Sequence, residues 1–240
     1  MSNLSKLKKK FRFGFDAIVA VLYLLVGSVV LLFKKNDIGP IYKGLRFFLR
    51  HPSYQETVRI LKSDPGFAEM IRTRYRAGAQ TDWDYLRSLP EGTLGRDFAE
   101  FMGGEMITQI DRLPEAGVQI DPETDYMRQR IRFTHDIHHV VCGYPATPLG
   151  EVQISAFYVA QIKSPLNMMV IAAGIIKATI WSPERIQDVI AAVVEGWHAG
   201  KNAESLFSVK YEEIWNEPLP VIRRRLKLPE QKTSSLRSSA

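Results

Sequence analysis

The chain has 240 residues, 45% of them hydrophobic and 24% charged, which is enough for one or two domains with a folded core. Its single cysteine, Cys142, excludes an intrachain disulfide framework and is compatible with a reducing compartment. The net charge of +6 is the sum of basic ends, +8 over residues 1–50 and +5 over 221–240, and an acidic middle, −7 over 51–220. A nucleic-acid binder would carry its basic patch on the folded middle, so this distribution argues against one. It suits basic ends that bind an anionic membrane surface, or basic tails that only aid solubility.

The first predicted element is an apolar N-terminal helix, residues 17–33, which carries no charge. It is flanked by Lys8, Lys9, Lys10 and Arg12 before it and by Lys34 and Lys35 after it. As a helix it would extend roughly 26 Å, at the short limit for a bilayer core of ~30 Å. We expect it to span the membrane, to lie in the interface with snorkelling lysines, or to be a buried core helix. No Ala-x-Ala-like site follows it, so cleavage as a signal peptide is not expected.

Helices separated by polar turns are predicted for residues 36–100. Ser53 is expected to cap one of them, with Glu56 as its capping-box partner. The sequence Asp-Pro-Gly at residues 64–66 and the segment 90–95 are both typical of turns.

A long helix is predicted next, because Asp121 is a suitable cap, Pro122 suits the first helical position and Gly143 suits the end. Another helix is predicted from Glu151, whose negative side chain is favoured in a first turn. Residues 165–181 then form a helix that is apolar on nearly every face. Such a helix is either buried or faces lipid.

Ser182 and Pro183 are typical of the cap and first residue of a further helix. No segment alternates apolar and polar residues for long enough to predict a sheet. The expected fold is therefore all-α, with a single helical domain over residues 39–228. An apolar membrane-associating helix is expected within residues 1–38, and a disordered tail over 229–240.

The strongest functional signal is a short stretch that holds three of the chain's five histidines. On a helix with ~100° per residue, His135 and His139 share one face, as two ligands on a metal-binding helix do. Asp136 and His138 lie on opposite shoulders of that face, and the spacing does not decide which of them joins the pair. Two imidazoles with one or two carboxylates suit Zn²⁺ or another divalent first-row ion. A turn can fold the next helix back and bring Glu151 to the metal.

Other polar groups near this face have more than one interpretation. Cys142 could be a soft ligand, although a lone cysteine is more often a small core residue. His138 could be a solvated bystander, or it could hold a ligand in place by a hydrogen bond. Arg128 and Arg132 lie one turn apart and could hold a carboxylate or phosphate, whereas Arg130 points elsewhere. The alternative is pairing with acidic residues at the start of the same helix.

The histidines belong to a wider pattern of residues with fixed spacing. Its members are Asp121, Pro122, Glu123, Tyr126, Gln129, Arg130, Arg132, His135, Asp136, His139 and Glu151. This pattern resembles the signature of the coenzyme Q biosynthesis protein 4 family of the ubiquinone pathway. The segments 89–96 and 193–226 are also similar to that family, so the resemblance covers about residues 40–228. Ile131 and Phe133 depart from the family pattern and leave the ligands intact.

The resemblance implies an all-helical fold and a divalent metal, zinc by family expectation, with Mg²⁺ or another divalent ion as alternatives. It implies Asp136, rather than His138, as a ligand beside His135, His139 and Glu151. It further implies a prenylated aromatic ligand and attachment to the membrane. The activity it implies is removal of the C1 carboxylate of a polyprenyl-hydroxybenzoate, with hydroxylation at that carbon, together with a role in organising the biosynthetic complex.

Arg130 and Arg132 complete the expected catalytic set, because a guanidinium could place the substrate carboxylate. The prenyl tail is expected to bind Phe157, Leu166, Met169, Ala173 and Ile176. The competing hypothesis is a lipid-binding scaffold without catalysis, because zinc has no redox chemistry. Expected partners are the membrane surface and other quinone-biosynthesis proteins, a homo-oligomer is left open, and no nucleic acid is expected. The expected location is the cytoplasmic face of a membrane, or the matrix face of the inner membrane in a mitochondrion.

Overall fold

The structure is a computed structural model that describes Ile18, Leu22, Leu49 and residues 52–76, 81–110 and 120–229, with residues 104–110 described by their backbone alone. The predicted N-terminal helix at 17–33, apart from two isolated positions, and the predicted tail beyond residue 229 lie outside the described residues. Among the helices that are described, none combines the length and the apolar character needed to cross a membrane.

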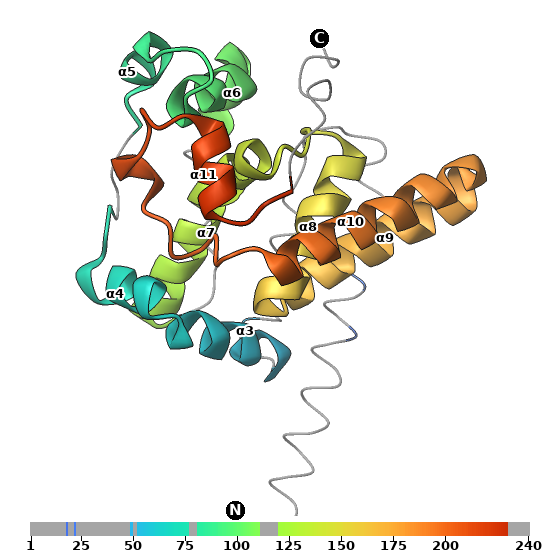
Figure 1. The fold of residues 1–240 in the computed structure, drawn as a ribbon. Coiled ribbons are helices and arrows are strands. Elements are labelled where there is room, and N and C mark those ends of the chain that lie inside the picture. Colours follow the sequence, from blue (N-terminus) through green and yellow to red (C-terminus); the bar gives the residue numbers. More distant parts are fainter. Residues whose placement is uncertain are drawn as a thin grey trace, which may run out of the picture.

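The described chain is helical throughout, as the sequence predicts (Figure 1). Its α-helices are α3 (Pro52–Ser63), α4 (Pro65–Thr73), α5 (Trp83–Ser88), α6 (Leu94–Ile110), α7 (Pro122–Cys142), α8 (Pro148–Ile162), α9 (Pro165–Trp181), α10 (Ile186–Asn202) and α11 (Leu219–Arg225). Two short 3₁₀ helices, η1 (Pro183–Arg185) and η2 (Tyr211–Glu213), precede α10 and α11. The described segments contain one isolated antiparallel bridge, between Thr93 and Pro218, and no strand.

The ends of α7 form as the sequence predicts. The Asp121 side chain accepts a hydrogen bond from the Thr124 N–H at 3.0 Å, and Pro122 occupies the first turn. Gly143 ends the helix with a φ of 73°, a conformation that glycine adopts without strain. The guanidinium of Arg223 on α11 also donates to carbonyls in the last turn. The long helix that carries the histidines is therefore fixed at both ends.

Three predicted helix starts differ from the structure. α3 begins at Pro52, so Ser53 lies inside the helix instead of capping it. α8 begins at Pro148, three residues before Glu151, and Thr147 is its cap. The Ser182 side chain makes no capping bond, because a 3₁₀ turn separates it from α10. In α3 and α8 a proline in the first turn marks the start, whereas Pro183 begins the 3₁₀ helix η1 and not α10.

The main hydrophobic core lies between α7, α8 and the segments that pack around them. Its largest fully buried side chains include Tyr211, Phe67, Phe98, Phe157 and Met127. α10 packs closely on α8, because glycines face it. A Cβ at Gly196 would lie 2.1 Å from the Gln153 carbonyl oxygen, and one at Gly200 would lie 2.6 Å from that of Phe157. These helices therefore form one tightly packed layer.

α9 is attached to this layer much less closely. Within it, Ile171 and Ala178 are the buried residues, so the apolar helix lies at the surface and not inside a core. Exposed large apolar side chains continue from α9 to α10: Met168, Ile175, Ile176, Ile180, Trp181, Ile186, Ile190, Val194 and Trp197. We call these residues the apolar hairpin face. Figure 1 shows that the connected ends of α9 and α10 extend beyond the other helices.

Candidate metal centre

A short turn brings the start of α8 onto the last turns of α7. Gly150 makes this approach feasible, because a Cβ there would lie 1.8 Å from the Pro145 carbonyl oxygen. Thr147 caps the new helix through its side-chain oxygen, which accepts from the Gly150 N–H. The first turn of α8 therefore presents Glu151 to the histidine face of α7.

Three donor atoms converge at this junction. The Nε2 atoms of His135 and His139 are 3.3 Å apart. Each lies 3.4 Å from a carboxylate oxygen of Glu151. One ligand atom from each residue lies within 4.8 Å of the others. Two nitrogens and a carboxylate gathered on one point are a donor set that suits a divalent ion.

The two histidines are held by different neighbours. His139 is 1% exposed, and its Nδ1 lies 3.1 Å from the Tyr144 carbonyl oxygen. That carbonyl accepts the Nδ1–H, and this bond directs the Nε2 edge of the ring toward Glu151. His135 has a side chain that is 20% exposed, and its ring meets the rings of His139 and Tyr158 edge to face, at 4.8 and 6.0 Å. Its orientation is set by ring contacts and by Glu151.

The charges at the junction support each other in the metal-free protein. Burial lowers the pKa of His135, but its interactions with Glu151 outweigh burial and raise the pKa above its usual value. Burial alone would raise the pKa of Glu151, but its contacts with His135 and His139 hold it far below the usual range. A cation at this point would compete with protons for the same nitrogen and oxygen atoms.

Asp136 is the predicted ligand that the structure does not add to this cluster. It is half-buried, and its charge acts on His135, but its oxygens are not among the atoms that converge. Its role as a ligand stays a prediction. Cys142 is 6% exposed, and burial raises the pKa of its thiol, so the structure places it as a core residue.

His138 is not solvated, which excludes one of its two interpretations. Its side chain is 0% exposed, and its Nδ1 lies 2.6 Å from the Tyr158 hydroxyl. Tyr158 was not predicted as a site residue. The signal that could have indicated it is its position seven residues after Glu151 on α8, which puts both side chains on one helix face.

The arginines before His135 have different surroundings. Arg130 is 5% exposed and forms a two-pronged ion pair with Glu212, with one bond of 3.0 Å. Arg128 pairs with Asp125 at 3.2 Å, as one alternative anticipated. The Arg132 Nε is buried without a hydrogen-bond partner among the described residues, and its charge acts on His135. The Nε of Arg130 also lacks a partner, but Glu212 engages the Nη groups of that residue, whereas the charge of Arg132 acts on His135.

The predicted lipid-binding residues divide between core and surface. Phe157 is 0% exposed and belongs to the main core. Leu166, Met169 and Ala173 are half-buried, and Ile176 is 41% exposed. A Cβ at Gly174 would lie 3.0 Å from Val152 Cγ2, so the middle of α9 lies beside the first turn of α8.

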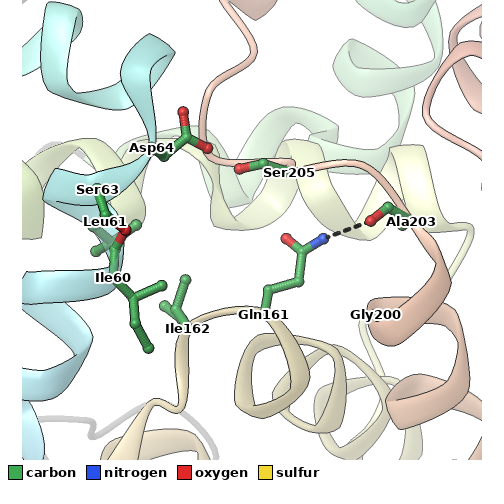
Figure 2. A pocket seen from close by; sticks show the side chains of 9 residues that line it. All are labelled: Ile60, Leu61, Ser63, Asp64, Gln161, Ile162, Gly200, Ala203 and Ser205. Carbon is green, nitrogen blue, oxygen red and sulfur yellow. Dashed lines mark hydrogen bonds between the residues drawn. The ribbon is translucent and has the colours of Figure 1, made fainter.

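A separate pocket of about 300 Å³ lies at the other end of α8 (Figure 2). Its lining comprises Ile60, Leu61, Ser63, Asp64, Gln161, Ile162, Gly200, Ala203 and Ser205. The Gln161 amide donates to the Ala203 and Glu204 carbonyls, and Asp64 accepts from backbone N–H groups at the start of α4. The polar side chains of Asp64 and Gln161 in this lining are thus bonded within the protein.

Comparison with known proteins gives one family. The sequence profile described as "Coenzyme Q (ubiquinone) biosynthesis protein Coq4" matches residues 50–232. The mitochondrial ubiquinone biosynthesis protein COQ4 homologue of Bos taurus is 33% identical over 172 residues, which are 71% of this chain and 63% of that protein. The mitochondrial COQ4 of the yeast Meyerozyma guilliermondii is 27% identical over 176 residues, 72% of this chain and 55% of its own. The matched part of the chain thus spans less than two thirds of these relatives.

A solved structure has the same fold. It is a crystal structure of a Nostoc punctiforme protein whose name assigns it provisionally to ubiquinone biosynthesis. The TM-score is 0.74, and the match covers 89% of this chain and 97% of that one. The sequences are 24% identical, so this likeness shows the fold alone.

Proposed function

The chain belongs to the Coq4 family of coenzyme Q (ubiquinone) biosynthesis proteins, and from that membership we propose that it removes the C1 carboxylate of a polyprenyl-hydroxybenzoate, with hydroxylation at that carbon. The observation that carries this proposal is the convergence of His135, His139 and Glu151 on one point at the junction of α7 and α8. Such a cluster beside an apolar helix suits an aromatic head group with a long apolar tail.

The donor set fits a divalent ion, and we propose zinc. His135, His139 and Glu151 would hold it, with Asp136 as a further ligand. When bound, such an ion acts as a Lewis acid that stabilises negative charge on a phenol oxygen or carboxylate. The Tyr144 carbonyl keeps the His139 Nε2 available as a donor. The protein's contribution is thus a fixed, partly buried donor triangle.

Arg132 is the residue that we propose to place the substrate carboxylate. Its buried Nε has no hydrogen-bond partner in the described chain, and the residue lies one helical turn before His135. A guanidinium can bind a carboxylate through two parallel hydrogen bonds. Arg130, in contrast, is engaged by Glu212, so we propose that it holds α7 against the segment before α11.

The surface of α9 is the proposed path of the prenyl tail. Gly174 meets Val152, one residue from Glu151, so a head group at the metal site can continue as a tail along α9. Ile176 and Ile180 extend this apolar surface away from the site. Methionines such as Met168 and Met169 add side chains that adapt to different ligands.

Membrane attachment is proposed from two features. The sequence 17–33 is apolar and flanked by lysines. Where α9 leads into α10, the apolar hairpin face includes Ile180 and Trp181, and Lys177 and Arg185 lie nearby in the sequence. Aromatic and apolar side chains next to basic ones are typical of membrane interfaces. If the protein is mitochondrial, as the names of its relatives state for them, the matrix face of the inner membrane is the proposed location.

The second candidate is a non-catalytic, lipid-binding scaffold that organises a complex of quinone-biosynthesis proteins. The extent of the apolar hairpin face favours it, because large exposed apolar patches mark interaction sites. Zinc lacks redox chemistry, so the hydroxylation needs a separate oxidant.

Carbon dioxide release distinguishes the two candidates. Purified, zinc-loaded protein is given a short-chain prenylated hydroxybenzoate that carries ¹³C in its carboxylate, with and without an oxidant. We expect labelled CO₂ from the wild type and from Cys142→Ser, but none from His139→Ala. Mass spectrometry of the ring product shows whether hydrogen or hydroxyl occupies C1. Release that is equal in His139→Ala and wild type would remove the proposed metal centre from the reaction.

A further inference from the structure

A buried histidine and tyrosine connect the core to the metal centre. His138 on α7 and Tyr158 on α8 are 0% and 2% exposed, and their Nδ1 and hydroxyl oxygen are 2.6 Å apart. The tautomer of His138 decides which of the two groups donates this hydrogen bond and which accepts it.

Aromatic rings surround this hydrogen bond and leave it little room to move. The His138 ring lies 5.4 Å from that of Phe207 and 5.5 Å from that of Tyr211. The Tyr158 ring lies 5.0 Å from that of Phe207. Rings packed edge to face in this way hold both partners in one orientation.

The other edge of this cluster reaches the metal centre. The Tyr158 ring stands at 87° to the His135 ring, with centroids 6.0 Å apart. His139 has a backbone carbonyl at its Nδ1, whereas the described structure shows no such hydrogen bond at the Nδ1 of His135. Tyr158 is therefore a side chain whose ring contact helps to fix the orientation of the His135 ring.

We propose that His138 and Tyr158 are positioning residues for His135. The hydrogen bond between them holds the Tyr158 ring at the angle that directs the His135 Nε2 toward the point where the three donors converge. This inference rests on the metal centre of the proposed function. Neither residue touches the metal or the substrate. Partners that orient a metal ligand typically contribute 10–100-fold to metal affinity.

The test compares two buried tyrosines that each lose one hydroxyl. Tyr158→Phe keeps the ring and loses the bond to His138. Tyr211→Phe is the matched control, because the Tyr211 hydroxyl donates to the Leu206 carbonyl at 3.1 Å and its ring also contacts His138. We expect Tyr158→Phe to bind Zn²⁺ about tenfold more weakly and to change the Co²⁺ visible spectrum. Tyr211→Phe should do neither, although both variants melt at a lower temperature.

Two further measurements keep the outcome decisive. In a double-mutant cycle, His138→Phe with Tyr158→Phe should weaken Zn²⁺ binding no more than Tyr158→Phe alone. In metal-free protein, nuclear magnetic resonance signals of the His135 ring should shift in Tyr158→Phe and not in Tyr211→Phe. Wild-type affinity and unshifted His135 signals in Tyr158→Phe would overturn the inference. A wild type that binds no metal would overturn the metal centre instead, and the His135 signals would still decide the positioning role.

Discussion

In most proteins, polar side chains lie at the surface and large apolar ones lie inside. Two regions of this molecule differ from that rule in opposite ways: the junction of α7 and α8, and the apolar hairpin face. The junction buries polar groups: Arg130, His138 and His139 are all at most 5% exposed. The hairpin exposes large apolar groups, with Ile180 at 61% and Trp181 at 54%. Both arrangements are unfavourable for an isolated folded domain. Buried polar groups cost free energy unless they are hydrogen-bonded, and apolar surface that stays in water contributes nothing to the stability of the fold. The comparison teaches that the polar groups of the junction find partners inside the protein, whereas the apolar groups of the hairpin have no such partners within the described structure and would gain from the ligand or surface proposed above.

The largest effect is expected where the compensation is internal. Arg130→Met leaves Glu212 buried and unpaired, so it should lower the free energy of unfolding by about 3–5 kcal/mol. The double variant Arg130→Met with Glu212→Met should recover much of that loss. Arg59→Met, which removes an exposed pair with Glu56, should change the free energy of unfolding much less, because solvent screens such a pair. Urea denaturation measures all three. Unchanged stability in Arg130→Met would show that the pair is not needed to hold α7.

The second effect concerns the cluster of His135, His139 and Glu151, which we propose to bind a metal. His139→Ala should reduce Zn²⁺ affinity on the order of 100-fold or more, because one of three converging donors is lost. Cys142→Ser should bind normally. Asp136→Ala tests the ligand that the structure leaves outside the cluster, and a loss like that of His139→Ala would add it. Metal analysis and competition with a chelator provide the values. Full occupancy in His139→Ala would contradict the assignment.

The third effect is a difference in pH dependence between metal-free and loaded protein. The folded pKa of His135 is raised, so its contribution to stability is complete below the usual value of 6.5 and is lost as pH rises through the folded value. The folded pKa of Glu151 is lowered, so its contribution is present above the usual 4.5 and is lost as pH falls further. In the metal-free protein we therefore expect His135 and Glu151 to contribute most to stability between pH 4.5 and 6.5.

Metal affinity should fall as pH decreases, because protons compete for the same nitrogen. Melting temperatures with and without Zn²⁺ should therefore diverge as pH rises from 5 to 8, and parallel curves would contradict this.

The smallest effect on stability is expected at the hairpin. Ile180→Lys should change the free energy of unfolding by about 0.5 kcal/mol or less, because this side chain packs little. It should nevertheless weaken binding to anionic phospholipid vesicles. Gln187→Lys is the control, since it adds the same charge on exposed α10 without removing apolar surface. Co-sedimentation of the full chain measures both. Equal binding by the two variants would indicate that the hairpin faces another protein and not lipid.

The sequence predicted the parts of the fold that depend on local signals. Asp121, Pro122 and Gly143 bound α7 because caps and prolines act within one turn. The i, i+4 spacing placed His135 and His139 on one face, and the following turn brought Glu151 to them. The surface position of α9 was left open, because a helix that is apolar on every face carries no information on which side packs.

Contacts between distant segments could not be predicted in this way. Glu212 lies 82 residues from Arg130, and no spacing rule connects them. The Tyr144 carbonyl has no side-chain signal, because any residue supplies a carbonyl. The His138–Tyr158 bond depends on how two helices cross, a matter of tertiary packing that periodicity on each helix does not determine.

The short connection between α7 and α8 has a consequence for how the protein is made. His135, His139 and Glu151 lie within seventeen consecutive residues, so closing the chain around a metal loses little entropy. Contacts so local in sequence are the ones that form early in folding. If the site binds a metal as proposed, its three donors are all present in the growing chain once the start of α8 has emerged, before α9, α10 and α11 are synthesised. An ion bound at that stage would stabilise the contact between α7 and α8 before the rest of the fold is complete.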